Sequence, residues 1–462
     1  MRLPRLRSQT RAHPQSLREP LTCDQARKMT LHQLRLGKPL PPLTSTIMDE
    51  MKPQPLASRT GDLIRNNIAF LAPGIFLLML PFAGTVALRL STLAIAAITA
   101  AFIWRRATPP SVPLKLPIFL WAMVAALSLV WALDLHYSLV EIKNEIGYTL
   151  MAFLSFYALT NDERAWRTWN VFLAVGFVAI SITAAYYFTQ GSIAFHAGKH
   201  GGPGSFSTYL ILVCPLLFLA LDRSRTQPER RPLVWALSIL VIVGGYISLN
   251  RAFWISLALS IITFVGLHLF RGPDRARALQ RLALVSVITL LVTGLLMFAS
   301  MKWRQYAGML ADDQLEATFR DPRIDLWIFT LQHIWSHPLV GTGFGIGSTH
   351  SVLDAMQLKD PVLWHAHNIF LNYGLQMGLP GVLALLFLFL SIGREFLTLY
   401  RAPDETCSKL GAAGLAMLVG AVAKSMTDAH LGRNGSLLFW ALIGMMLGYG
   451  KRLASHQARA PA

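Results

Sequence analysis

Long apolar runs alternate with short polar connections along most of this sequence. A helix needs roughly 20 apolar residues to cross the hydrocarbon core of a bilayer. Apolar runs bounded by charged residues, proline or glycine predict twelve membrane-spanning helices. They cover residues 67–85, 88–104, 114–133, 141–160, 169–188, 205–222, 233–249, 252–270, 281–301, 369–392, 408–427 and 435–450. The expected fold is an all-α polytopic membrane protein.

Lysine and arginine are unevenly divided between the two sets of connections. Cytoplasmic loops of membrane proteins are enriched in these residues. After the first predicted span, one set of alternate connections together with the C-terminal tail carries nineteen of them, and the opposite short loops carry six. The six are Arg89, Lys143, Lys199, Arg251, Lys424 and Arg433. The count predicts that both termini are cytoplasmic and that these six residues face the other side.

One connection, residues 302–366, is far longer than the others and falls on the extracytoplasmic side by the same count. Connections beyond about 12–15 residues are often functional. Within it, Arg320 to Trp335 has the apolar spacing typical of a helix at the membrane interface. The predicted organisation is a cytoplasmic tail (1–60), nine spans (61–301), the large loop (302–366), three spans (367–450) and a cytoplasmic tail (451–462).

The composition supports lipid as the main solvent, because 53% of the residues are hydrophobic and only 14% are charged. The net charge of +18 gathers in the N-terminal tail and in alternate loops, so it indicates topology and not nucleic-acid binding. Cys23, Cys214 and Cys407 are far apart, which argues against a disulfide framework or a zinc site.

Residues 1–60 are rich in Arg, Lys and Pro and contain no continuous apolar stretch, so they do not have the pattern of a signal peptide. Two interpretations stay open. The segment is a tail that binds anionic lipid headgroups, or translation begins later, at Met48 or Met51.

Three extracytoplasmic cations are candidates for binding phosphate. Arg251 stands in SLNRAFW between two spans, Arg323 in DPRIDLW in the large loop, and Lys199 in the glycine-rich HAGKHGGPGS. Each also has an explanation without function. Arg251 could extend its side chain to water at the membrane surface, Arg323 could pair with a neighbouring aspartate, and Lys199 could lie in a loop that only connects two spans. Together they suit a lipid-linked pyrophosphate, because an arginine binds phosphate oxygens with two parallel hydrogen bonds and keeps its charge.

The segment His365-Ala366-His367-Asn368 marks the point where the large loop is expected to re-enter the membrane. Histidine exchanges protons near neutral pH and is the usual general base. The alternative is an interfacial histidine that caps a helix. A role of the two histidines as a pair of metal ligands is less well supported, since no carboxylate cluster accompanies them. We expect neither a metal nor another cofactor.

This segment resembles a motif of the O-antigen ligase and polymerase family. His367-Asn368 is followed by nine residues, IFLNYGLQM, and then by Gly378, two residues and Gly381. Two further segments match the family. Arg251 follows a turn between two central spans, although the sequence reads Asn-Arg-Ala where Ser-Arg-Gly is commoner. Arg323, with Leu326-Trp327, is followed by HPLVGTG at residues 337–343.

The resemblance implies a membrane glycosyltransferase with a GT-C-like fold and a large periplasmic loop in the bacterial inner membrane. It further implies that Arg251 and Arg323 bind the pyrophosphate of an undecaprenyl-linked O-antigen donor, with Lys199 beside them. His367 would be the catalytic base. Asn368, Gly378 and Gly381 complete the motif. The expected acceptor is lipid A–core, so that the reaction completes lipopolysaccharide, and the other partners are membrane lipids, without nucleic acid.

Two alternative functions stay open. An O-antigen polymerase shares the same motifs and differs in its acceptor. A third member of the family, the protein O-oligosaccharyltransferase, usually has a further C-terminal region, whereas Gly450 is followed by 12 residues here. A flippase for lipid-linked oligosaccharides would be expected to carry ionisable residues near the bilayer midplane. The spans contain few of them, so an enzyme is favoured.

Overall fold

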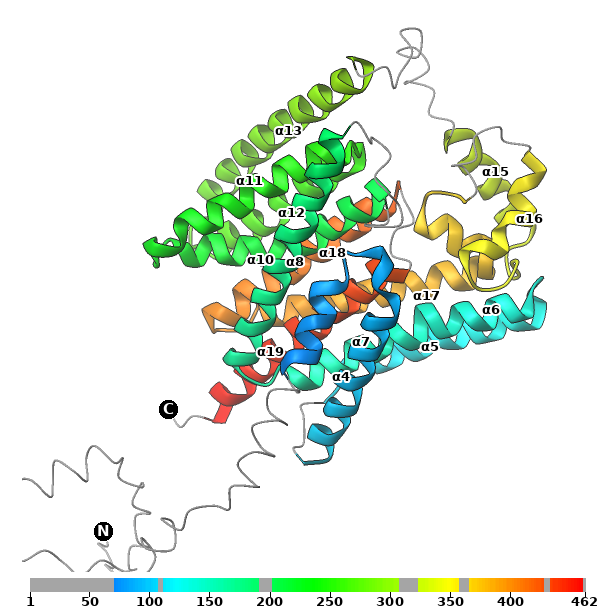
Figure 1. The fold of residues 1–462 in the computed structure, drawn as a ribbon, viewed down its shortest axis with the longest axis horizontal. Coiled ribbons are helices and arrows are strands. Elements are labelled where there is room, and N and C mark those ends of the chain that lie inside the picture. Colours follow the sequence, from blue (N-terminus) through cyan, green and yellow to red (C-terminus); the bar gives the residue numbers. More distant parts are fainter. Residues whose placement is uncertain are drawn as a thin grey trace, which may run out of the picture. The chain divides into compact units, whose positions relative to one another are not determined.

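The computed structural model describes residues 70–106, 111–190, 202–306, 323–356, 365–427 and 433–459. Every regular element in these ranges is a helix (Figure 1). Because a helix satisfies its own backbone hydrogen bonds, it is one of the two structures that can cross a bilayer. The predicted all-α fold of a multi-pass membrane protein is confirmed.

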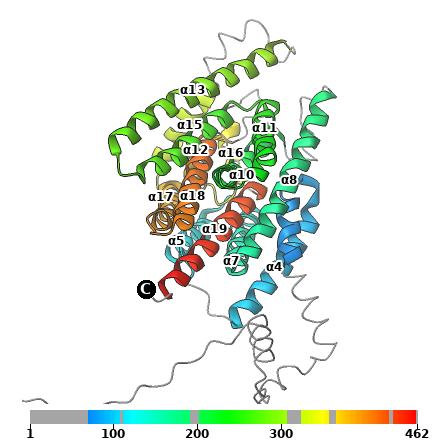
Figure 2. The same cartoon turned by 90° about the vertical axis from the view of Figure 1, so that its left-hand side faces the viewer.

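Nine helices in the described ranges are long and apolar enough to span a membrane. They are α4 (Val86–Arg106), α8 (Glu163–Thr189), α10 (Gly202–Ser224), α11 (Arg231–Ser248), α12 (Arg251–Phe270), α13 (Arg275–Tyr306), α17 (Ile369–Tyr400), α18 (Glu405–Ser425) and α19 (Arg433–Arg459). Each corresponds to a predicted span. α13 lies along the outside of the bundle beside α12 in both views (Figures 1 and 2).

The other three predicted spans are shorter or interrupted, so a count of twelve is not confirmed. The run 67–85 contains a ten-residue helix, Phe70–Met79, which stops before Pro81. Proline lacks an N–H group and disfavours helical backbone in the residue before it. The run 114–133 contains α5 (Lys115–Leu127), which continues as a 3₁₀ turn to Trp131.

The run 141–160 is helical but irregular. A wider π-helical turn, Ile142–Gly147, separates α6 (Leu135–Glu141) from α7 (Tyr148–Leu159). The turn contains Lys143 and Glu145, and Glu141 directly before it is buried. π turns inside helices are rare and often lie at functional sites.

Charged side chains gather at one end of the bundle, which is called the charged end. There Arg223 pairs with Glu163 at 3.2 Å and Lys409 pairs with Asp222. Arg452 donates to the carbonyl oxygens of Tyr157 and Ala158 at 2.7 and 3.0 Å. These contacts join α8, α10, α18, α7 and α19, so loops far apart in sequence share one end.

The opposite end is called the site end. It holds the C-terminus of α18 and the N-termini of α10, α12 and α19. This follows from the helix directions, because each of these helices has its other terminus at the charged end. In the pair α12–α18, Ser260 Oγ donates to the carbonyl of Ala416 at 3.0 Å, and Arg271 donates to the carbonyl of Pro403 at 2.9 Å. The two helices are therefore antiparallel.

The long connection contains ordered helices. α13 extends to Tyr306, and the described residues resume at α15 (Arg323–Ser336). This helix confirms the one predicted from Arg320 to Trp335, with slightly different ends. A short helix, α16 (His350–Leu353), follows. The position of this segment outside the cell membrane stays a prediction.

Candidate functional site

The three described candidate residues lie at the starts of helices. Arg251 is the first residue of α12, Arg323 is the first residue of α15, and His367 is two residues before α17 begins. A helix N-terminus carries a partial positive charge, which attracts anions and disfavours cations by about 0.3–1 kcal/mol. Two arginines at such positions oppose the local preference.

The C-terminal end of α18 connects these residues. Asn368 Nδ2 donates to the carbonyl of Met426 at 3.1 Å, and Arg323 Nη1 donates to the carbonyl of Thr427 at 3.0 Å. The large loop and the start of α17 are thereby attached to the same short backbone segment. His367, directly before Asn368, lies beside it.

Arg251 lies at the same level of the bundle. Ser260 contacts Ala416, and a Cβ atom on Gly420 would lie 3.5 Å from the Ser256 carbonyl. Continuing this antiparallel register by one turn places Arg251 beside Lys424, close to the end of α18. The Arg251 side chain is exposed, whereas Lys424 is fully buried. The structure thus places Arg251 at the site end without a direct contact to Arg323 or His367.

His367 has a left-handed backbone, with φ of +49°, which is unusual for a residue with a side chain. Its N–H donates to His365 Nδ1 at 3.0 Å, and the two imidazole rings stack with centroids 3.8 Å apart. The Nδ1 atom of His365 is therefore unprotonated, because it accepts this bond. The sequence left the role of His365 open. Here it holds the backbone and the ring of His367.

Ala366, which lies between the two histidines, is held by hydrogen bonds to both its N–H group and its carbonyl oxygen. The N–H of Ala366 donates to Asn372 Oδ1 at 3.0 Å, and Trp327 Nε1 donates to the carbonyl of Ala366 at 2.8 Å. Trp327 belongs to α15 and Asn372 to α17. The unusual turn is therefore fixed by two different helices, as strained backbone at functional sites commonly is.

Asn368 explains why a polar residue follows the histidine. Its Oδ1 accepts hydrogen bonds from the N–H groups of Phe370 and Leu371 at 2.9 and 3.3 Å, so it caps α17. The same side chain reaches Met426 through Nδ2. One residue thus sets the start of α17 and links it to α18.

Gly378 and Gly381 are structural residues. α17 is kinked at Gly378, where φ is +67°, and a Cβ there would lie 2.7 Å from the Pro338 carbonyl. The kink and Pro380 deprive the carbonyls of Leu375 and Gln376 of their helical partners. A Cβ on Gly381 would lie 2.6 Å from Met377 Cβ. The motif glycines therefore shape α17.

The HPLVGTG segment at residues 337–343 supplies hydrogen-bond donors for the carbonyls of Leu375 and Gln376. Thr342 N–H donates to the Leu375 carbonyl at 2.9 Å, and Gly343 N–H donates to the Gln376 carbonyl at 3.0 Å. In return, Leu379 N–H donates to the Pro338 carbonyl at 2.7 Å. Hydrogen bonds between residues more than thirty positions apart thus join the two motifs into one unit around the kink. Sequence reasoning recognised both but did not predict this pairing.

The remaining charged and histidine residues considered for the site either do not lie at this junction or are outside the described residues. Lys199 lies outside the described residues, as does Asp321. In the large loop, burial and then the charge of His337 lower the pKa of His333. Its side chain belongs to α15. Among the described residues, His367 is the histidine next in sequence to Asn368, which contacts Met426 at the junction with α18.

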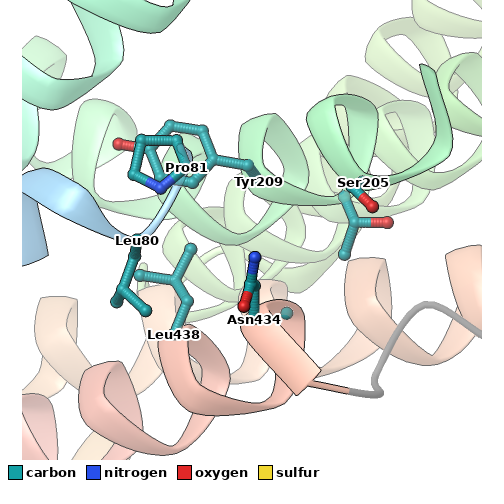
Figure 3. A pocket seen from close by; sticks show the side chains of 8 residues that line it. Leu80, Pro81, Ser205, Tyr209, Asn434 and Leu438 are labelled. Atoms are coloured by element: carbon teal, nitrogen blue, oxygen red, sulfur yellow. The ribbon is translucent and has the colours of Figure 1, made fainter. Parts of the chain in front are cut away.

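A small cavity with a mainly apolar lining lies at the site end between α10, α19 and the turn after Met79 (Figure 3). Ser205, Thr208 and Asn434 supply its polar groups, and Leu80 and Pro81 form an apolar wall. Its volume of about 30 Å³ is that of roughly one water molecule. It is too small for a sugar ring and is not the glycan site.

Comparison with known protein families assigns part of the chain to a family. Residues 236–386 match the model of a family described as O-antigen ligase. The matched segment contains Arg251, Arg323, His367 and both motif glycines. This segment of the chain belongs to the O-antigen ligase family. The O-antigen ligase domain extends from α11 to the middle of α17, which includes the turn of His367 and the kink. A comparison with curated proteins found no match.

The family match supports a general type of activity. Together with the apolar helices, it supports a multi-pass membrane protein with glycosyl transfer of the O-antigen ligase and polymerase type, in lipopolysaccharide biosynthesis. Lys424 lies outside the O-antigen ligase domain. A single ionisable residue within a long apolar run was the sequence signal that could have identified it as part of the site end.

Proposed function

We propose that this protein transfers O-antigen from undecaprenyl pyrophosphate to a sugar hydroxyl of lipid A–core at the periplasmic face of the inner membrane. The observation that carries the proposal is the junction at the end of α18. Arg323 and the His367-Asn368 motif both attach there, and Arg251 lies at the same level. Cations and a histidine thus share one end of a membrane-embedded bundle.

The donor diphosphate is held by Arg251 and Arg323, with Lys199 as a third cation. Guanidinium groups suit this task because they form paired hydrogen bonds with phosphate oxygens and stay charged. As the bond between the anomeric carbon and the diphosphate oxygen breaks, negative charge grows on the leaving undecaprenyl pyrophosphate. Two fixed arginines stabilise that charge, so the reaction needs no metal ion.

His367 acts as the general base. It removes the proton from the acceptor hydroxyl while the oxygen attacks the anomeric carbon from the side opposite the diphosphate, which inverts the configuration. The proton stays on His367 until it passes to water. The turn around Ala366 and the stacked His365 ring fix the imidazole in one position, as catalysis by a positioned base requires.

The orientation is proposed with the charged end in the cytoplasm and the large loop in the periplasm, as in a GT-C-like enzyme. The grouping of Arg223, Lys409 and Arg452 at one end supports it, because cytoplasmic loops are enriched in basic residues. The donor diphosphate then lies at the depth of the periplasmic headgroups.

The test is complementation of a deletion strain, with lipopolysaccharide analysed on a gel. The wild-type chain should restore O-antigen on lipid A–core, and His367→Ala or Arg251→Ala should leave a bare core and accumulated lipid-linked polymer. Single-unit decoration in the deletion strain would identify a polymerase. Loss of all lipid-linked glycan from the periplasmic leaflet would identify a flippase. Normal lipopolysaccharide with both variants would refute the assigned roles.

A further inference from the structure

Arg89 is a buried cation whose hydrogen-bonding capacity is mostly unused. It lies in the first turn of α4, and only 3% of the residue is exposed. Nη2 donates to the Ala83 carbonyl at 3.4 Å, a long bond. Within the part of the chain that the structure describes, the buried Nε and Nη1 atoms have no partner.

An unused guanidinium in this position requires an explanation. Arginine cannot lose its proton in a protein, so it cannot escape the cost of burial by becoming neutral. It also does not snorkel outward here. Arg89 lies on the same face of α4 as Leu93, Ala96 and Ala100, all of which are buried. A missing anionic partner explains the arrangement.

Arg89 lies at the site end of the bundle. The other end of α4 is at the charged end, because the Tyr157 hydroxyl donates to the Ser111 carbonyl, just after α4, at 3.0 Å. Arg89 and Arg105 are 16 residues apart in one helix, which corresponds to about 24 Å along its axis. Arg89 is therefore near one face of the hydrocarbon core, at the depth of lipid headgroups.

A second unused polar group lies across the same turn. Ala83, the acceptor of the Arg89 bond, follows Leu80 and Pro81, which line the small cavity of Figure 3. The Thr208 hydroxyl also lines this cavity, is buried, and has no partner among the described residues. Two unsatisfied donors thus lie near the same turn.

The surroundings indicate which anion reaches this turn. The helices on either side of it expose Leu71, Val86 and Leu88, so their outer faces contact lipid. The fixed anion of a bilayer at headgroup depth is the phosphate of a lipid. We propose that Arg89 binds a lipid phosphate at the site end, in a site separate from Arg251, Arg323 and His367. This claim goes beyond the proposed transfer reaction and does not depend on it.

The experiment measures binding to the full-length protein in detergent. Dihexanoyl phosphatidic acid is titrated while thermal unfolding is followed, with dihexanoylglycerol as the uncharged counterpart. The variants are Arg89→Gln and, as a matched control at the other end of α4, Arg105→Gln. The wild type and Arg105→Gln should bind with the same affinity, and Arg89→Gln should bind at least about tenfold more weakly, the usual loss for a charged hydrogen bond.

Two further measurements make the result decisive. Without ligand, Arg89→Gln should unfold at or above the wild-type temperature, because an unpaired buried charge has been removed. His367→Ala should bind phosphatidic acid like the wild type, which separates this site from the proposed catalysis. If inorganic phosphate reproduces the Arg89-dependent shift, the site stands and its ligand is free phosphate. Equal affinity of Arg89→Gln and wild type, or a less stable ligand-free Arg89→Gln, would overturn the proposal.

Discussion

At the scale of single residues, the structure assigns different tasks to side chains that the sequence placed together. Sequence reasoning identified His367, Arg323 and Arg251 from their motifs, and all three lie at the site end. It did not identify the task of His365, because stacking and acceptance of the His367 N–H depend on a left-handed turn. A pattern of residue types does not reveal such a backbone conformation.

Replacing His365 by alanine should slow the proposed transfer without weakening donor binding. The His367 imidazole would lose its stacked neighbour and its backbone would lose an acceptor, so the base would be less well positioned. We expect kcat to fall on the order of tenfold to a hundredfold with KM for the donor unchanged, less than the loss for His367→Ala, since a positioned base contributes about 10²–10⁴-fold. Steady-state kinetics check this. An unchanged kcat would show that His365 does not position His367.

The Arg323→Lys substitution should weaken binding of the donor, although it keeps the positive charge. Lysine keeps the charge but lacks the planar fork that can bind a phosphate while one nitrogen holds the Thr427 carbonyl. We expect an increase in KM for the donor of about tenfold or more. Arg275→Lys, at the charged end, is the matched control and should behave like the wild type. The same KM for both variants would show that Arg323 contributes charge alone.

At the scale of elements, the kink in α17 is the feature that joins two motifs. The sequence showed Gly378, Pro380 and HPLVGTG separately. Their relation depends on which carbonyls the kink releases, and this is decided by three-dimensional packing between segments that are distant in sequence. Here the sequence predicted the parts and not their connection.

Gly378→Ala should destabilise the protein by about 1–3 kcal/mol or more, because alanine disfavours a φ of +67° and its Cβ would collide with the Pro338 carbonyl. Gly294→Ala in α13 is the control. A Cβ there has open space within 4 Å, so the variant should be neutral or slightly more stable. Thermal unfolding in detergent checks both. Equal unfolding temperatures would contradict the role given to the kink.

At the scale of the whole molecule, hydrophobicity predicted most of the architecture, whereas the orientation inferred from basic residues stays a prediction. Nine of the expected spans are long apolar helices. Their long apolar runs are readable from composition, because a helix in lipid must have apolar side chains and satisfy its own backbone hydrogen bonds. The remaining three are not confirmed as spans: Pro81 and the π turn at Ile142–Gly147 interrupt two of them, and the third contains the shorter apolar helix Lys115–Trp131. A hydropathy count does not detect such interruptions.

The proposed orientation predicts which surfaces a membrane-impermeant thiol reagent reaches in intact cells with a permeabilised outer membrane. In a chain whose native cysteines are replaced by alanine, Ser336→Cys in α15 should be labelled. Thr226→Cys, at the charged end, should be labelled only after the inner membrane is opened. Both side chains are exposed, so access to the reagent depends on the membrane alone. The reverse pattern would invert the topology.

The most direct test of the central claim is reconstitution of the purified protein with undecaprenyl-pyrophosphate-linked O-antigen and lipid A–core, in the presence of EDTA. The account predicts glycosylated lipid A–core and free undecaprenyl pyrophosphate, formed by the wild type and not, at a comparable rate, by His367→Ala or Arg251→Ala. Absence of product with the wild type, or equal rates with the His367→Ala variant, would contradict it.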